Sequence, residues 1–304
     1  MVIDLKDGDC GVDTFLCAEK QVGNTKNGKL YYSLRLQDST GVINAKVWEV
    51  SSVPEFSAGD FLQVAYQINL FAGNIQLKVL NLQLAEVEDI SKYVRSSKFE
   101  TKNMMDVLLN IADSVQNDWL RKLLNSFMQD SKFFTSFVKG PGAVKVHHAF
   151  SGGLLQHTLF VTRVASSLAK IYKDYVNYDL LVTSAILHDI GKVEEINGVL
   201  AYEFTEKGTM YGHTVLGAMK ISEKCNEIDG FPKKLKDNLV HCVLAHHGEL
   251  EWGAPVKPAL IEALILHFAD NLDSRIAIFD EDISIGPGTF SRYLGTRLLT
   301  TDGV

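Results

Sequence analysis

The stretch His188-Asp189-Ile190-Gly191-Lys192 follows an apolar run, residues 180–187, that predicts a buried helix. This helix would deliver an imidazole and a carboxylate side by side, and Gly191 is predicted to end it as a C-cap. Both side chains suit divalent transition metals, and a buried carboxylate needs a compensating cation. Because two adjacent ligands cannot hold an ion alone, the stretch predicts further ligands elsewhere in the chain.

Candidate ligands occur on both sides of this stretch. They are His157 in GGLLQHT, His213 in YGHTVLG, His246 and His247 in LAHHGEL, and Asp270 in LHFADNLD. The order H…HD…H…HH…D resembles that of the HD-domain metal-dependent phosphohydrolases. With HHAFSGGLLQHT, AILHDIGK and HFADNLD, the chain most resembles the YhaM-type 3′-to-5′ exoribonucleases, which join an OB-fold to an HD domain. The resemblance covers nearly the whole chain and is strongest over residues 147–273.

The resemblance implies two groups of metal ligands. The first is His157, His188, Asp189 and Asp270; the second is His213, His246 and His247, with Asp189 bridging two ions. The alternative for the second group is contact with substrate phosphate or proton donation. Neighbours such as His246 and His247 diverge by roughly 100° on a helix, so the sequence leaves open which one faces the site. Without sulfur ligands, one or two ions of Mn²⁺ or Co²⁺ are expected, with Fe²⁺, Zn²⁺ and Mg²⁺ as alternatives.

Four residues are expected to take part in catalysis, namely Asp189, Lys192, His213 and His246. Lys192 either neutralises a substrate phosphate or is a solvated cation near a helix end. The resemblance makes His148 a candidate substrate contact. Some HD phosphodiesterases carry a proton-donating histidine four residues before the first ligand, but here that position is Gly153, which leaves the donor open.

Residues 1–88 predict a five-stranded OB-like β-barrel. Hydrophobic side chains alternate with polar ones in short runs separated by turn residues, as half-buried strands require. A tight hairpin turn is expected around Ala72-Gly73-Asn74. The expected strands are 12–22, 30–36, 42–48, 61–71 and 75–84.

The second and third strands carry the binding face of an OB-fold. Alternation would turn Tyr31, Arg35, Lys46 and Trp48 outward, which gives two aromatic rings for bases and two cations for phosphates. The alternative is an ordinary barrel surface on which Trp48 is half-buried packing.

Apolar residues recur at helical spacing from residue 89 onward. Residues 89–142 are expected to form a helical connector that packs on an all-α HD domain, residues 143–304. Lys and Arg outnumber Asp and Glu by nine to five in residues 91–150. These basic side chains either line a path for a polyanion or belong to a solvated helix face. The main expected helices are 154–172, 178–188, 212–226, 235–246 and 258–273, while residues 280–304 stay unassigned.

Composition narrows the functional classes. The net charge of −7 argues against indiscriminate nucleic-acid binding. Four cysteines without a CxxC pair read as reduced thiols of a cytoplasmic protein, and neither a signal peptide nor a membrane span is apparent. The expected partner is therefore a single-stranded RNA or DNA rather than a membrane, and a homo-oligomer is left open.

Three functions compete for this pattern. The first is a metal-dependent 3′-to-5′ exonuclease of single-stranded RNA, or also DNA, that releases nucleoside 5′-monophosphates; its direction is implied by the resemblance alone. The second is an HD-type phosphohydrolase of small nucleotides, either a nucleotidase or a cyclic-nucleotide phosphodiesterase. The third is a single-strand-binding protein without catalysis. The OB-like region favours a polymer substrate, and the complete ligand set argues against a decayed site.

Overall fold

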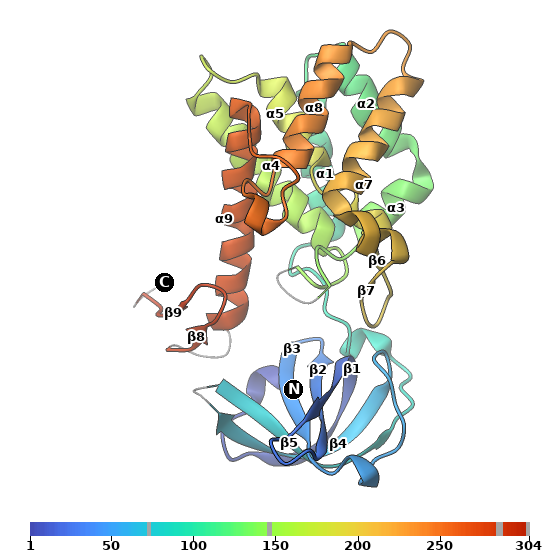
Figure 1. Ribbon diagram of the computed structural model, residues 1–304, viewed down its shortest axis with the longest axis vertical. Coiled ribbons are helices and arrows are strands. Elements are labelled where there is room, and N and C mark those ends of the chain that lie inside the picture. Colours follow the sequence, from blue (N-terminus) through green and yellow to red (C-terminus); the bar gives the residue numbers. More distant parts are fainter. Residues whose placement is uncertain (72–73, 145–147, 284–287, 302–304) are drawn as a thin grey trace. The chain divides into compact units, whose positions relative to one another are not determined.

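A computed structural model describes residues 1–71, 74–144, 148–283 and 288–301. The chain divides into two compact units (Figure 1). The barrel unit comprises Met1–Ser96, Gly198–Tyr202 and Ile278–Val304, and the helical unit comprises Ser97–Asn197 and Glu203–Ala277. Among the helices described, none has the length and apolarity that crossing a bilayer demands.

The barrel unit is a closed five-stranded barrel with the strand order β1-β2-β3-β5-β4, an OB fold. Its antiparallel pairs are joined by one parallel pairing, β3 with β5. The predicted alternation is confirmed, because Leu34 and Leu36 point into the core together with Ile43 and Ala45. The strands are β1 (Cys10–Asn24), β2 (Leu30–Asp38), β3 (Gly41–Val47), β4 (Phe61–Phe71) and β5 (Asn74–Leu84).

Short 3₁₀ helices complete the barrel unit: η1 (Val2–Asp4), η2 (Val50–Ser52) and η3 (Ile90–Lys92). Val2 lies in the barrel core, and its amide donates to the Asp38 carboxylate over 2.7 Å. The turn expected at Ala72-Gly73 lies outside the described residues.

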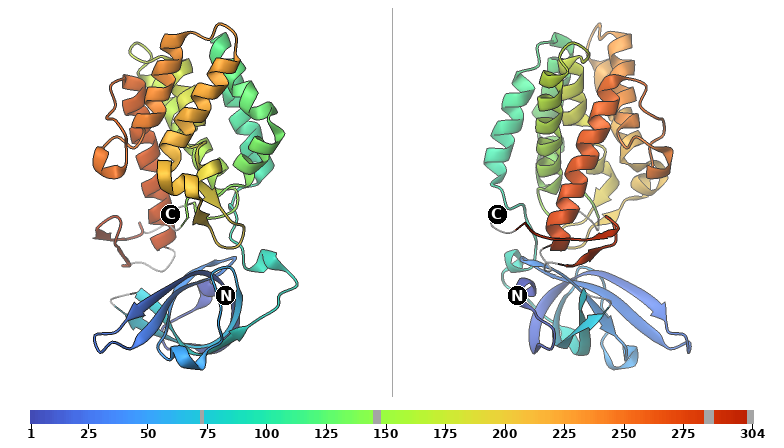
Figure 2. Two further views of the ribbon diagram at one scale, coloured as in Figure 1. Left: turned by 45° about the vertical axis from the view of Figure 1, so that its right-hand side comes forward. Right: turned by 90° about the vertical axis from the view of Figure 1, so that its left-hand side faces the viewer.

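The helical unit is built from antiparallel neighbours joined by short loops (Figure 2). Asparagine side chains cap two of its helices, Asn117 at α2 and Asn177 at α5, by accepting from the first free amides. The helices are α1 (Thr101–Asp113), α2 (Asp118–Gln129), α3 (Ser131–Lys139), α4 (Gly153–Ile171), α5 (Tyr178–Leu187), α6 (Lys192–Glu195), α7 (Glu206–Glu227), α8 (Lys233–Ala245), η4 (Leu250–Trp252) and α9 (Ile261–Ile283). Small hairpins are formed by β6 (Ile196–Asn197) with β7 (Glu203–Phe204) and by β8 (Phe290–Ser291) with β9 (Thr296–Arg297).

Helix α5 is the central element of the helical unit. Every residue from Leu180 to Leu187 is buried, because α5 takes part in two apolar cores. One core joins it to α1–α4, α7 and α8, and the other joins it to α4, α8 and α9. The residues that follow α5 are thereby fixed in the interior, where a charged group requires a partner.

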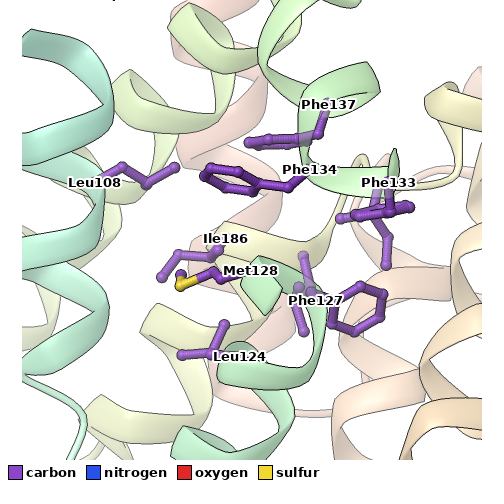
Figure 3. Close-up of a pocket in the computed structure, with 10 residues that line it drawn as sticks. Leu108, Leu124, Phe127, Met128, Phe133, Phe134, Phe137 and Ile186 are labelled. Carbon is purple, nitrogen blue, oxygen red and sulfur yellow. The ribbon is translucent and has the colours of Figure 1, made fainter. Parts of the chain in front are cut away.

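An apolar pocket lies behind the end of α5 (Figure 3). Its phenylalanines come from α2 and α3, and Phe134 stacks on Phe137 with ring centroids 6.3 Å apart. Such a lining offers no ligand for an ion or a phosphate. The pocket is therefore part of the apolar core that supports residues 188–192. It is lined by Leu108, Leu124, Phe127, Met128, Phe133, Phe134, Phe137, Ile186, Leu187 and Ile190.

Three local expectations differ from the structure. Gly191 is not a C-cap: α5 ends at Leu187, and Gly191 has right-handed helical angles (φ −63°, ψ −21°) at the start of α6. The expected helix 212–226 starts earlier, at Glu206, and is kinked at Gly212 (φ 69°, ψ 158°). The tail left unassigned begins with the last turn of α9 and contains the β8–β9 hairpin.

Candidate metal centre

The five histidines predicted as ligands are oriented in the same way. Each directs Nδ1 at an oxygen that can only accept, so Nδ1 carries a proton and Nε2 is the nitrogen left for a metal ion. The pairs are His157 with Asp273 (2.7 Å), His188 with Ala185 O (2.8 Å), His213 with Glu195 (3.0 Å), His246 with Val243 O (2.6 Å) and His247 with Trp252 O (2.9 Å). This is the arrangement by which proteins prepare imidazoles as metal ligands.

The first group of predicted ligands converges. His157 Nε2 lies 3.2 Å from His188 Nε2, 3.3 Å from Asp189 Oδ2 and 3.2 Å from Asp270 Oδ1. His188 Nε2 lies 3.4 Å from Asp189 Oδ2 and 4.0 Å from Asp270 Oδ1. Ligands at about 2.1 Å from one ion are separated by roughly 3 to 3.5 Å when adjacent and by up to about 4.2 Å when opposite, so these four atoms fit around a single divalent ion.

The second group of predicted ligands surrounds the other carboxylate oxygen of Asp189. Asp189 Oδ1 is 3.4 Å from His213 Nε2 and 3.7 Å from His246 Nε2, and His213 Nε2 is 3.2 Å from His247 Nε2. Both His246 and His247 face the centre. They lie at the end of α8, where His246 is the C-cap, and Gly248 (φ 78°) turns the chain directly after them.

Unsatisfied polar atoms at the centre fit a bound cation. Oδ1 of Asp189 and Nε2 of His246 are buried and accept no hydrogen bond, while Asp189 Oδ2 has an ion-pair partner in Lys192 Nζ, 2.6 Å away. Leaving buried acceptors unpaired costs free energy, which an ion between them would offset. Among the described residues, the donors at the centre are imidazole nitrogens and carboxylate oxygens, a set that suits a divalent metal.

The pKa shifts at the centre agree with this donor set except at His157, where burial is outweighed by bonds to Asp189, Asp270 and Asp273, which raise the pKa of the ring well above 6.5. A divalent ion competes with that proton for Nε2. Burial raises the pKa of the Asp189 carboxyl, but the Lys192 ammonium and the neighbouring rings of His188 and His157 outweigh it and hold the pKa well below its usual range. The pKa of Asp270 is also lowered, by its bond to His157 against the effect of burial. For His246, burial and the neighbouring His247 lower the pKa of the ring well below 6.5. Ionised carboxylates and a neutral imidazole are the forms that ligate a cation.

His148 and Lys192 take positions around the ligands. His148 is buried behind His157, and its Nε2 contacts the same Asp273 oxygen that His157 contacts, over 2.9 Å. Its φ of +60° is the one positive φ of a described residue other than glycine. Lys192 reaches back from α6 to Asp189, and that carboxylate raises the pKa of its ammonium against the opposing effect of burial.

Two functional residues escaped the sequence analysis, Asp273 and Glu195. Asp273 accepts from His148 and His157, while Glu195 accepts from both the ring and the amide of His213. Spacing could have indicated Asp273, since it lies three residues after Asp270 and therefore on the same side of a helix. Glu195 carries no such signal, because only the folded α6–α7 pair brings it to His213.

On the barrel unit, the predicted face groups two aromatic rings and a lysine. The rings of Tyr31 and Trp48 lie 5.2 Å apart and tilted by 35°, and Trp48 is 43% exposed. Lys46 Nζ lies 4.9 Å from the Tyr31 centroid and donates to Ser33 over 2.8 Å. The Tyr31 ring covers Gly23 on the neighbouring strand, where any Cβ would meet it at 2.6 Å. Arg35, on the same face of β2, is partly buried.

The chain is similar to known proteins over most of its length. The HD-domain family model matches residues 154–275. A 3′-5′ exoribonuclease YhaM from Oceanobacillus iheyensis is 32% identical over 289 residues, 92% of this chain and 89% of the relative. One from Halalkalibacterium halodurans is 33% identical over 286 residues, 92% of this chain and 88% of the relative. Among solved structures, the second OB-fold domain of replication protein A from Methanococcus maripaludis matches 29% of this chain and 96% of its own, at 21% identity and a TM-score of 0.24.

The relatives extend over both units, and the HD-domain match contains the residues that converge on Asp189. The chain therefore belongs to the YhaM family of HD-domain proteins.

Proposed function

We propose that this chain is a metal-dependent 3′-to-5′ exonuclease that degrades single-stranded RNA in the cytoplasm and releases nucleoside 5′-monophosphates. The observation that carries the proposal is the convergence of four Nδ1-anchored histidines on the two oxygens of one buried aspartate, with a fifth, His247, beside His213. The names of the relatives supply the direction of attack and the RNA substrate. In this proposal residues 1–88 bind the strand, residues 89–142 connect, and residues 143–304 hydrolyse it.

Each group of ligands has a role in the proposal. His157, His188, Asp189 and Asp270 would hold one divalent ion, and Asp189 would share a second, if bound, with His213, His246 and His247. When bound, such ions activate water and neutralise phosphate charge. Mn²⁺ or Co²⁺ is proposed, since imidazoles and carboxylates accept either.

Lys192 and His213 would serve the phosphate and the leaving group. Lys192 places a buried ammonium beside Asp189, where it attracts a substrate phosphate oxygen as a point charge. His213 donates from Nδ1 to a carboxylate, Glu195, and a carboxylate partner makes the other ring nitrogen more basic. With a single ion bound, His213 is therefore the member of the second group best placed to protonate the departing ribose oxygen, and His246, with a carbonyl at Nδ1, is the less suited alternative.

The barrel face would hold the strand upstream of the cleaved end. Tyr31 and Trp48 offer rings for stacking bases, and Arg35 and Lys46 offer cations for phosphates. His148 would not contact the substrate. It would instead help to orient His157, because both rings contact the same oxygen of Asp273.

An assay with a 5′-labelled single-stranded RNA tests the proposal. With Mn²⁺ the full chain should shorten the RNA stepwise from its 3′ end and release 5′-monophosphates, and Asp189→Asn should stop turnover with an unchanged far-UV circular dichroism spectrum. Immediate release of the label as a mononucleotide would indicate attack from the 5′ end and would reject it. Full activity of Asp189→Asn would reject it as well. Chelation should abolish turnover, and hydrolysis that persists without divalent ions would count against the metal.

A double variant of the barrel face separates a polymer substrate from a small nucleotide. Tyr31→Ala with Trp48→Ala should raise the KM for a long RNA at least tenfold and leave hydrolysis of bis-p-nitrophenyl phosphate unchanged, because each stacked base contributes about 1–3 kcal/mol. Tyr175→Ala, an exposed tyrosine of the helical unit, is the matched control. Equal KM values for RNA in the double variant and the wild type would favour a small-nucleotide phosphohydrolase.

A further inference from the structure

Helix α9 has two different sides. One side contributes Asp270 and Asp273 to the metal centre. The other side carries a row of exposed apolar side chains, here called the α9 stripe. It consists of Ile261 (40% exposed), Leu264 (45%), Phe268 (60%), Leu272 (47%) and Ile276 (58%).

The spacing of the α9 stripe is that of a helix–helix contact. Its members are separated by three, four, four and four residues, so at about 100° per residue they fall within roughly 120° of the helix circumference. A helix face that only meets water carries polar residues at such positions. Here Arg275 falls near one margin of the row and Asn271 just outside it, and the two pair with each other, Nε to Oδ1 over 2.7 Å.

Helix η4 extends the apolar surface. Leu250 is 59% exposed and Trp252 is 51% exposed. The Trp252 ring lies 5.7 Å from that of His267, which lies 5.1 Å from the ring of Phe268, so η4 borders the α9 stripe. In the right-hand view of Figure 2 no other helix of the helical unit passes in front of α9.

The exposed area is large enough for a stable interface. A large apolar side chain presents on the order of 200 Å² when fully exposed, so the α9 stripe with Leu250 and Trp252 presents roughly 700 Å². The largest apolar patch of an ordinary monomer is about 300–600 Å². A standard protein interface buries about 800 Å² on each partner, and this apolar surface alone reaches most of that area.

We propose that the α9 stripe, with Leu250 and Trp252, is the contact between two copies of this chain. The surface matches itself, because a two-fold axis beside α9 sets one apolar row against the same row of the second copy. A nucleic acid is a poor occupant: aliphatic groups dominate the row, and Arg275 is the single cation that α9 carries over Ile261–Ala277. Burying the row removes apolar area from water on both copies at once.

Light scattering coupled to gel filtration tests the pairing at tens of micromolar protein. The wild type should have twice the 33.7 kDa mass of one chain, or a higher multiple. Phe268→Lys should halve that mass or reduce it further, because it sets two ammonium groups into the apolar contact. Met219→Lys is the matched control, since Met219 is 56% exposed in the middle of α7, and it should keep the wild-type mass.

A wild type that elutes at 33.7 kDa, or a Phe268→Lys chain that keeps the wild-type mass, overturns the proposal. Far-UV circular dichroism establishes that each variant is folded. Should Phe268→Lys not fold, the milder double variant Leu264→Gln with Leu272→Gln decides by the same criterion. In addition, an affinity-tagged copy should retain an untagged copy of the wild type, and retention should be lost when both copies carry the variant.

Discussion

At the scale of single residues, Asp273 controls the direction of two imidazoles. One of its oxygens lies 2.7 Å from His157 Nδ1 and 2.9 Å from His148 Nε2. Burial raises the pKa of this carboxyl, but the two bonds outweigh it and lower the pKa to about 2. Asp273 therefore stays ionised and fixes the His157 tautomer that leaves Nε2 open toward Asp189 and Asp270.

We predict that Asp273→Asn weakens Mn²⁺ binding by 10- to 100-fold, the usual cost of losing a group that orients a ligand. The amide has no charge and offers one acceptor oxygen in place of a carboxylate, so His157 is no longer held in a single tautomer. Isothermal titration of Mn²⁺ into the metal-free protein measures the change. Asp174→Asn, at an exposed position, should bind as the wild type does, and an unchanged dissociation constant for Asp273→Asn would show that the bond has no such role.

The candidate ligands could be predicted from the sequence because each lies in a short, recognisable sequence motif. Asp273 and Glu195 could not be predicted in this way, since each orients the ring of a histidine on another element, His157 and His213 respectively. The orientation of His246 and His247 was left open for a similar reason. It depends on where α8 stops, and that point is set by Gly248 and the packing of the following loop.

At the scale of elements, two glycines set the distance between α6 and α7. Gly191 and Gly217 face each other: a Cβ on Gly191 would lie 2.0 Å from His213 O and 2.6 Å from Gly217 N. A Cβ on Gly217 would meet nothing closer than 3.4 Å, an ordinary contact. This close approach is what brings His213 of α7 to Asp189, so Gly191 serves packing rather than the helix end that the sequence suggested.

Gly191→Ala should therefore lower the free energy of unfolding by about 3 kcal/mol, because backbone atoms of α7 cannot move aside as a flexible side chain would. Gly217→Ala, inside a helix and with room for its methyl group, should be neutral or raise stability by up to about 1 kcal/mol. Urea unfolding of both variants, followed by far-UV circular dichroism, measures the difference. Equal stabilities would mean that α6 and α7 can separate freely.

Strand and helix positions were largely predictable, because hydrophobic period is a local property. The strand runs expected from alternation agree with β1 to β5 to within two residues at each end. The early start of α7 was missed, since Gly212 interrupts the helical pattern and its kink is held by the bond from the His213 amide to Glu195. Tertiary contacts, rather than local preference, decide such points.

At the scale of the whole molecule, both units bury thiols that folding keeps protonated. Burial raises the pKa of Cys17 in the barrel unit, and of Cys225 and Cys242 in the helical unit, from 9.0 to about 12. Cys10 is exposed, and none of the four is in a disulfide. In an unfolded chain the same thiols would ionise near their ordinary pKa, so the two states bind different numbers of protons in alkaline solution.

Stability should therefore fall on the alkaline side. A thiol whose folded pKa lies above its unfolded value contributes stability that is fully present below pH 9 and is lost as the pH rises toward about 12. For Cys17 alone, the loss between pH 7.5 and 10.5 is about 2 kcal/mol, from 1.36 kcal/mol for each pH unit above the unfolded pKa. Urea unfolding at the two pH values measures this loss. The Trp119→Phe, Trp252→Phe background leaves Trp48, whose fluorescence reports on the barrel unit. Cys17→Ala should reduce the loss by that amount and Cys10→Ala should leave it unchanged; identical losses in the two variants would exclude the Cys17 thiol as the cause.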